Sequence, residues 1–292
     1  MFEQMVVTQI VRENWIKQPY GGFFRKYQIY NFENNEYIDP INEKLHGTIV
    51  GNTVDNLTRY IAFPNMKLEN SLEAVFLGKK IFEDMFKRRK KGIAKLNEMF
   101  NKLPSLGRKL TKELIDIVAC FSYLSNMYRS GALESSYRDF MNFEHLSEID
   151  YQHIIIMVER SLQLVVDLKN KYSKMYPNFI VSYDKYHTIW GDGDYITNEM
   201  IIDFKCYKHN PYNKNNITQQ IIYYLLGKSG SSNVDIDFNK IKYLSLFDIR
   251  RNRLEFININ DYQKEIAYIQ NELDSIALEQ QKENQKFIDS LK

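Results

Sequence analysis

Residues 191–205 read Gly191-Asp192-Gly193-Asp194-Tyr195-Ile196-Thr197-Asn198-Glu199-Met200-Ile201-Ile202-Asp203-Phe204-Lys205. Two runs of β-forming residues flank Asn198-Glu199, a pattern typical of two strands joined by a turn. We predict a bend at Gly191-Asp192-Gly193, a short strand over 194–197 and a second strand over 200–207. Residues i and i+2 of a strand point to the same face, so Asp203 and Lys205 are expected side by side. The turn would bring Asp194 toward Asp203.

Two carboxylates and an ammonium group in this arrangement suit the hydrolysis of a phosphodiester. Asp194 and Asp203 are the type of ligand that Mg²⁺ (or Mn²⁺) prefers, and the backbone carbonyl of Phe204 could supply a further ligand. A bound metal polarises the phosphate and lowers the pKa of a bound water. Lys205 would then position that water and stabilise the charge that develops on the phosphorane oxygens.

The sequence on either side of this hairpin predicts a mixed α/β core. Two β-rich runs precede it, at 179–183 and 186–190. A helix over 217–227 follows, with Gly227 as its expected stop. A strand pair at 241–249 and 254–259 is joined by residues 250–253, and an amphipathic helix covers 261–291.

The segment before the core reads as helical. Apolar residues recur at helical spacing from about residue 66 to 176, so we predict a large helical insertion there. Val50, Val54 and Leu57 mark one face of an earlier helix, and residues 1–45 carry no clear pattern. We expect one domain over 1–292, with the insertion at 66–176, the catalytic core at 177–260 and the C-terminal helix at 261–291.

Composition excludes several classes of protein. The 292 residues are 44% hydrophobic and 26% charged, as in an ordinary globular protein, and the net charge of +2 says little about partners. Two cysteines cannot build a disulfide framework or a four-cysteine cluster, and the five histidines show no metal-ligand spacing. The longest apolar runs are far shorter than a membrane span, and no signal segment opens the chain, so we expect a cytoplasmic protein with no membrane partner.

Three motifs in order resemble the PD-(D/E)XK nuclease superfamily. The first is Asp194 followed by Ile201-Ile202-Asp203-Phe204-Lys205. The second, Gln219-Gln220-Ile221-Ile222-Tyr223, looks like the Gln-x-x-x-Tyr helix of the RecB-like branch. The third, Gly51-Asn52-Thr53-Val54-Asp55, is similar to the Gly-x-x-x-His/Glu element that opens many of these domains. The resemblance covers residues 191–226 and 47–59.

This resemblance implies a restriction-endonuclease-like fold and a nuclease that acts on nucleic acid, with DNA favoured. Asp194 and Asp203 would be metal ligands and Lys205 the catalytic lysine, while Gln219 and Tyr223 would line the site from the following helix. Asp55 would be an accessory metal ligand, although it departs from the usual His or Glu. The iron–sulfur cluster that the branch sometimes carries is excluded here, since the chain has two cysteines.

Each motif alone has a simpler interpretation. Asp-x-Lys can be a salt bridge, Gly-Asp-Gly-Asp a turn or a calcium-loop fragment, and Gln and Tyr four apart a neighbour pair on a helix. Asp192 is read as a turn former rather than a ligand, and Gln220 competes with Gln219. Gly-Asp-Gly-Asp, Asp-x-Lys and the Gln/Tyr pair follow one another within the 36 residues 191–226, and this order favours the nuclease. The alternatives are a non-catalytic nucleic-acid-binding or protein-interaction module on the same fold, and an unrelated binding protein.

Basic residues gather within the helical segment. Residues 69–112 hold twelve basic and five acidic side chains, including the run Lys87-Arg88-Arg89-Lys90-Lys91. This run is either a solvated helix face or a surface that contacts phosphates. The same two readings apply to Arg250, Arg251 and Arg253, while Arg59 either touches phosphate or pairs with a carboxylate. A protein partner or a homo-oligomer, if one exists, would use the helical segments.

Overall fold

The computed structural model describes residues 5–183 and 188–290, and it divides the chain into two compact units. The sheet unit contains the described residues up to Glu36 and from Leu168 onward. The helical unit covers Tyr37–Asp167. The chain therefore leaves the sheet unit after Glu36, completes the helical unit, and returns within one long helix.

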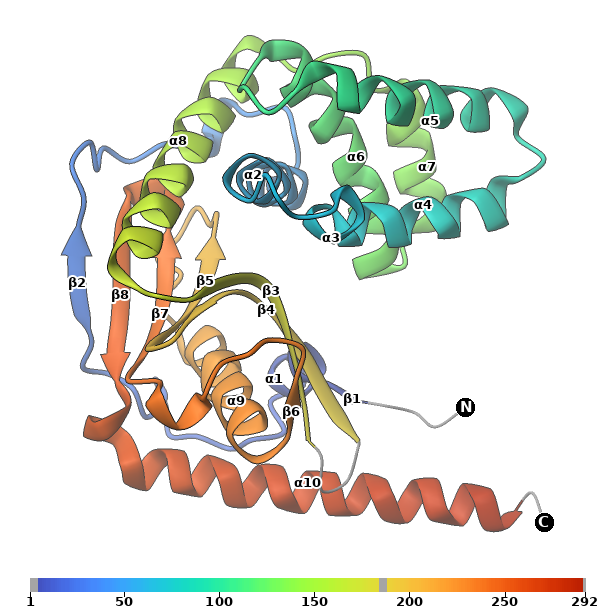
Figure 1. Ribbon diagram of the computed structural model, residues 1–292. Helices are drawn as coiled ribbons and strands as arrows, with labels where there is room; N and C mark the ends of the chain where they lie inside the picture. The colour runs from blue at the N-terminus through green and yellow to red at the C-terminus, as the bar shows by residue number, and fades with distance from the viewer. Residues whose placement is uncertain (1–4, 184–187, 291–292) are drawn as a thin grey trace. The chain divides into compact units, whose positions relative to one another are not determined.

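A mixed sheet forms the centre of the sheet unit (Figure 1). Eight strands are present in the described ranges: β1 (Met5–Val6), β2 (Gln28–Asn31), β3 (Met175–Ser182), β4 (Ile189–Thr197), β5 (Met200–Lys205), β6 (Ser231–Ser232), β7 (Tyr243–Asp248) and β8 (Arg253–Asn258). Their order is β2-β8-β7-β5-β4-β3-β6, with β1 beside β4. The β5–β7 and β1–β4 pairs are parallel and the others antiparallel. The predicted mixed α/β class is confirmed.

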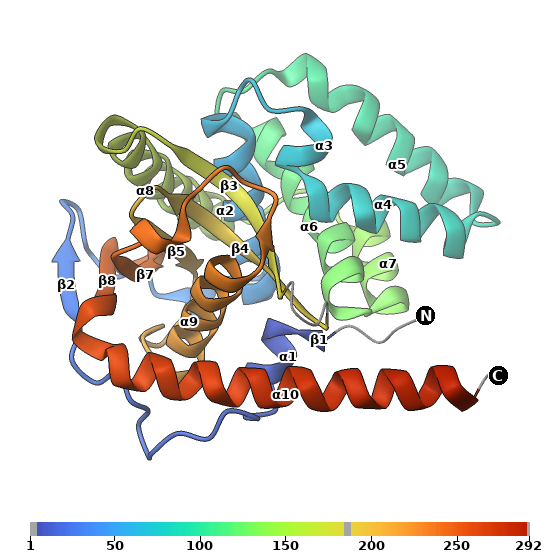
Figure 2. The same ribbon diagram turned by 60° about the horizontal axis from the view of Figure 1, so that its bottom comes forward.

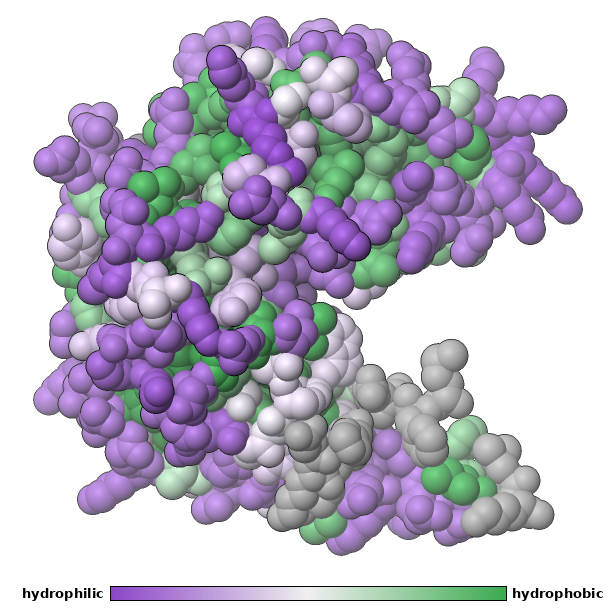
Figure 3. All heavy atoms as spheres, in the orientation of Figure 1, coloured by the Kyte–Doolittle hydropathy of each residue, from purple (hydrophilic) through white to green (hydrophobic). Residues whose placement is uncertain are grey.

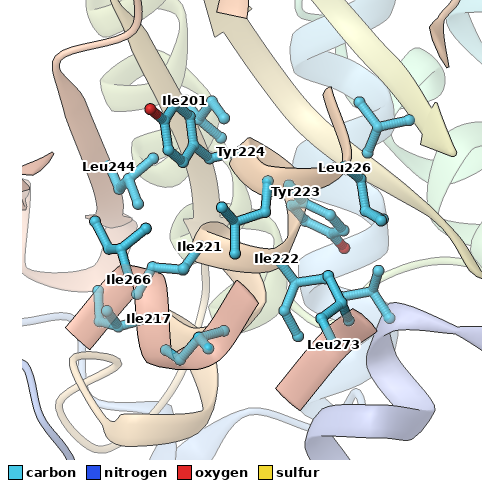
Figure 4. Close-up of a cluster of buried hydrophobic side chains, with 14 of the residues drawn as sticks. Ile201, Ile217, Ile221, Ile222, Tyr223, Tyr224, Leu226, Leu244, Ile266 and Leu273 are labelled. Atoms are coloured by element: carbon cyan, nitrogen blue, oxygen red, sulfur yellow. The ribbon is translucent and has the colours of Figure 1, made fainter. Parts of the chain in front are cut away.

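One helix of this unit is buried between the sheet and another helix. α9 (Lys214–Ser229) packs against β7, β3, β4 and β5, and against α1 (Val7–Arg12) and α10 (Gln263–Ser290). Figure 2 shows α10 running along α9 and α1. Apolar side chains of α9 such as Ile221 and Ile222 lie among Ile201, Leu244 and Leu273 (Figure 4). Burying each such side chain stabilises the fold by roughly 1.5–3 kcal/mol, so α9 is held firmly over the sheet.

The helical unit confirms the helical character expected for this part of the chain. Its helices are α2 (Gly47–Ala62), α3 (Leu68–Ser71), α4 (Glu73–Phe86), α5 (Lys90–Lys102), α6 (Lys112–Ser130), α7 (Leu133–Asn142) and most of α8 (Glu148–Lys171). α2, which precedes the range 66–176, belongs to the same unit, and residues 175 and 176 already belong to β3. Short 3-10 turns complete the two units at Pro40–Asn42, Leu103–Leu106, Phe238–Lys240, Ile249–Arg251 and Ile259–Tyr262.

The bend predicted at Gly191-Asp192-Gly193 is wrong, because β4 runs without interruption from Ile189 to Thr197. A Cβ atom on Gly191 would lie 2.5 Å from the ring of Tyr223, and one on Gly193 would lie 2.2 Å from the ring of Phe179. These glycines therefore let two aromatic rings pack directly on the strand. The turn at Asn198-Glu199 is confirmed, while Tyr186 and His187 of the earlier β-rich run lie outside the described residues.

The predicted limits of the helix over 217–227 are also wrong. α9 begins at Lys214, where the side chain of Asn213 accepts hydrogen bonds from the N–H groups of Asn215 and Asn216. It continues past Gly227 to Ser229. A Cβ atom on Gly227 would lie 2.1 Å from the ring of Phe238, so packing rather than helix termination accounts for this glycine. The strand pair β7–β8 and the C-terminal helix are confirmed.

No helix in the described part of the chain is both long and apolar enough to cross a membrane.

Candidate active site

The central strand β5 and its neighbour β4 position the charged residues. Their paired register ends at Tyr195 and Ile202, so Asp194 and Asp203 are the next residues outward on the two strands. The ring of Phe204 lies 4.4 Å from that of Tyr195 and 5.1 Å from that of Phe247. Because side chains alternate along a strand, this aromatic packing fixes Asp203 and Lys205 on the opposite face, which α9 covers.

The structure brings the two aspartates together. The Asp194 carboxylate accepts a hydrogen bond from the backbone N–H of Phe204 at 2.8 Å. Its negative charge also acts on Asp203, whose pKa it raises. The predicted approach of Asp194 to Asp203 is thus present, and both carboxyl groups meet where β4 and β5 end their pairing. The carbonyl of Phe204 as a ligand stays a prediction.

Asp203 and Lys205 form a nearly buried ion pair, with side chains 6% and 12% exposed. Burial raises the pKa of Asp203 to about 7; the charge of Lys205 opposes this rise and the charge of Asp194 adds to it. Burial alone would lower the pKa of Lys205, but Asp203, Tyr207 and Asp194 outweigh it and raise that pKa above its usual value. Lys205 therefore stays protonated near neutral pH.

Gln219 and Tyr223 face this centre from α9. The Gln219 amide donates a hydrogen bond to the Tyr223 hydroxyl at 2.6 Å. Burial raises the pKa of Tyr223 well above its usual value, and the charges of Asp192, Asp203 and Asp194 raise it further. The phenol therefore remains neutral, and its O–H group can donate a hydrogen bond. Gln220 is fully buried, and its side chain makes no hydrogen bond among the described residues.

Of the residues near the site, Tyr207 was missed by sequence reasoning and Asp192 was placed wrongly. Asp192 lies exposed within β4 rather than in a turn, and its charge reaches Tyr223. Tyr207 is 46% exposed, and its ring centre lies 5.8 Å from the Lys205 ammonium. The i, i+2 spacing of a strand was the signal that joins Asp192 to Asp194. It does not account for Tyr207, because β5 ends at Lys205 and the predicted strand end at residue 207 is wrong.

A second charged cluster borders Lys205. Lys205 pairs in register with Asp248, which lies 2.9 Å from the guanidinium of Arg251 and 3.6 Å from that of Arg253. Arg253 also lies 2.6 Å from Glu255. Arg250 donates to the carbonyl of Cys206, and Arg251 donates to that of Lys208. Arg251 and Arg253 therefore neutralise buried carboxylates, and Arg250 and Arg251 hold the segment after β5. These contacts favour a structural role for the three arginines over contact with phosphates.

Asp55 and Arg59 lie on α2, in the helical unit, and form an ion pair with each other. Arg59 is almost fully buried, so its pairing with a carboxylate is the alternative that the structure supports. The second oxygen of Asp55, Oδ1, is buried without a hydrogen-bond partner among the described residues. Asp55 as an accessory metal ligand stays a prediction.

Asp194 and Asp203 are the carboxylates of this centre that could hold a metal ion. Asp203 Oδ2 is buried, and its contact with Lys205 is an ion pair without hydrogen-bond geometry. Within the described residues, three or more His, Cys, Asp or Glu side chains do not gather in a metal-holding group. Mg²⁺ is commonly held by one or two carboxylates and several waters, so two aspartates are a sufficient protein contribution.

A comparison with protein-family models, curated proteins and solved structures gave no match for this chain.

Proposed function

We propose that this protein is a metal-dependent nuclease that hydrolyses DNA phosphodiester bonds at Asp194, Asp203 and Lys205. One observation carries the proposal: two carboxyl groups from adjacent strands meet beside a nearly buried, protonated lysine. A restriction-endonuclease-like core is part of the same proposal. It is supported by the resemblance of the motifs and by the order of strand, turn, strand and helix that carries them.

The charges of the site suit a divalent cation. Burial, and to a smaller extent repulsion by the Asp194 carboxylate, raises the pKa of Asp203 to about 7. A proton or a metal ion between them relieves this repulsion. When bound, Mg²⁺ or Mn²⁺ would polarise the scissile phosphate and lower the pKa of a water.

The chain's own residues divide the remaining work. Because its pKa is raised, Lys205 acts as a fixed positive charge beside the phosphate rather than as a general base. Asp203 holds the Lys205 ammonium in place through the ion pair. Asp194 is oriented by the Phe204 N–H, and Tyr223 offers a neutral hydroxyl that Gln219 positions.

The test is cleavage of linear and circular, single- and double-stranded DNA with Mg²⁺ or Mn²⁺. Wild type is compared with Lys205→Ala and with the matched control Lys242→Ala, an exposed lysine of the same unit that pairs with Glu199. We expect metal-dependent cleavage that Lys205→Ala abolishes and Lys242→Ala retains. Cleavage that survives Lys205→Ala would mean that these residues are not the active site.

Metal binding separates the enzyme from the alternative, a non-catalytic module. Titration with Mn²⁺, followed by calorimetry, should give a site that Asp203→Asn weakens at least tenfold and Asp237→Asn, an exposed carboxylate in the same unit, leaves unchanged. Pure wild-type protein that binds nucleic acid but cleaves neither DNA nor RNA would support the binding module instead.

A further inference from the structure

The turn between α4 and α5 carries the densest positive charge in the sequence. Lys87, Arg88 and Arg89 follow the last residue of α4, and Lys90 and Lys91 open α5. All five residues are exposed. In the space-filling view, hydrophilic side chains cover this outer end of the helical unit (Figure 3).

Arg89 differs from the other four cations because it has partners. Its guanidinium donates to both carboxylate oxygens of Glu134 on α7, at 2.8 and 3.2 Å. It also lies over the rings of Phe86 and Tyr137, at 4.7 and 4.3 Å from their centres. Arg89 thus links the turn to α7.

The four remaining cations, Lys87, Arg88, Lys90 and Lys91, face solvent. None of them forms a salt bridge or a side-chain hydrogen bond within residues 5–183 and 188–290. The nearest acidic residues along the chain are Glu83, which faces Lys79, and Asp84. Because Glu83 is paired with Lys79, Asp84 is the acidic residue left to balance these four cations along this stretch of chain. The stretch therefore has an excess of positive charge.

This excess works against the fold in the absence of a partner. Like charges repel, and Lys90 and Lys91 lie in the first turn of α5, where the helix macrodipole already places positive charge. That first turn holds no acidic residue, and no side chain caps it. A cation at such a position is unfavourable, whereas an anion there is stabilised. The arrangement is favourable once negative groups approach it.

We propose that Lys87, Arg88, Lys90 and Lys91 form a surface that binds the phosphate backbone of nucleic acid without regard to sequence. The regularly spaced phosphates of a polyanion can contact these four cations together. Because Arg89 links the turn to α7, the backbone of the turn loses little conformational freedom on binding. A membrane fits less well: interfacial segments place Trp, Phe or Leu beside their cations, and the nearest exposed large apolar residue along the described chain is Met85. The inference concerns binding and holds whether or not the protein cleaves DNA.

The test measures how affinity depends on salt. Fluorescence anisotropy with labelled 30-nucleotide single-stranded and duplex DNA is recorded in EDTA between about 50 and 300 mM salt. The full-length quadruple variant K87Q/R88Q/K90Q/K91Q is compared with wild type. For duplex DNA, log affinity falls with log salt, and each phosphate contact contributes about −0.9 to this slope. Losing four contacts should therefore make the slope less steep by about 3.6.

The matched control is K26Q/K264Q/K282Q/K286Q, which removes the same charge from exposed lysines of the sheet unit. We expect the control to keep nearly the wild-type slope, and circular dichroism to show that both variants fold. Equal losses in the two variants would overturn the proposal, since the net charge of the whole protein would then explain binding. So would the absence of DNA binding by wild type at the lowest salt, or selective binding of anionic vesicles or an acidic peptide in its place.

Discussion

Lys205 is nearly buried, yet it keeps its positive charge because the Asp203 and Asp194 carboxylates raise its pKa. The sequence predicted that Asp203 and Lys205 lie side by side, since their i, i+2 spacing on a β-type run is a local property. It left open whether burial lowers the pKa of Lys205 or the neighbouring carboxylates hold it up. It did not predict the place of Asp192 or Tyr207. Two glycines beside an aspartate predict a bend, because the sequence does not show that the rings of Tyr223 and Phe179 fill the space beside them.

Tyr223→Phe tests whether the hydroxyl on α9 takes part in the reaction. The change removes the group that accepts from Gln219 and faces the carboxylates, but it keeps the ring that packs on Gly191. Losing one such hydrogen bond is worth about 1 kcal/mol, so we expect kcat to fall roughly 5- to 10-fold with little change in thermal stability. Tyr224→Phe, one position along the same buried helix, should retain wild-type activity; equal losses in both variants would refute the role.

Tyr207→Leu tests contact with an unpaired base beside the site. Its half-exposed ring near Lys205 is a platform on which a base can stack, which is worth roughly 1–3 kcal/mol. We expect KM for a single-stranded oligonucleotide to rise at least 5-fold, and Tyr207→Phe to retain the wild-type value. Tyr20→Leu serves as the control, since that side chain is 98% exposed. An unchanged KM in Tyr207→Leu would exclude stacking.

Glu255 makes the stability of the sheet depend on pH. Burial raises its pKa from 4.5 to about 7; Arg253 opposes the rise and Asp248 adds to it. The folded protein therefore holds this proton more tightly than the unfolded chain. The stabilisation is complete below pH 4.5 and is lost as pH rises through about 7.

Glu255→Gln should remove this dependence. Relative to wild type, the variant's free energy of unfolding should increase by on the order of 1–3 kcal/mol between pH 4.5 and 8. Urea unfolding at several pH values measures it, with Glu283→Gln on the exposed side of α10 as the control. A difference between wild type and variant that is independent of pH would contradict the assignment.

At the scale of elements, apolar periodicity predicted which segments are helices or strands better than it predicted where they end. The hairpin β4–β5, the pair β7–β8 and the C-terminal helix were all predicted, because each is encoded in a continuous run of residues. The end of α9 was not. Gly227 looks like a helix stop in sequence, and only the ring of Phe238, packed against it, shows why a glycine is needed there.

Gly78→Ala tests the contact between α4 and α6. A Cβ atom at this position would lie 2.0 Å from the backbone oxygen of Leu124, and a backbone atom cannot move aside as a flexible side chain can. We expect the free energy of unfolding to fall by about 1–3 kcal/mol or more. Gly47→Ala, where the added atom meets nothing within 4 Å, should be neutral or stabilising. Chemical denaturation followed by circular dichroism compares the two.

At the scale of the whole molecule, the sequence predicted a mixed α/β core preceded by helices, and the structure has both. It did not predict that residues 5–36 complete the sheet. β2 is short and its four residues are exposed, so it lacks the alternation that marks a half-buried strand. Its partner, β8, is more than two hundred residues away, and no local pattern reports such a pairing.

That pairing sets an order of events during synthesis. The ribosome makes β2 before the helical unit and β8 after it. Until β8 emerges, the backbone groups of Gln28–Asn31 have no strand to join. Contacts between distant segments slow folding, because the entropy of closing the intervening loop is lost before any contact forms. The β2–β8 pair is therefore completed only after the helical unit has been made, and until residues 253–258 emerge, β2 is an unpaired strand that can join other chains and aggregate.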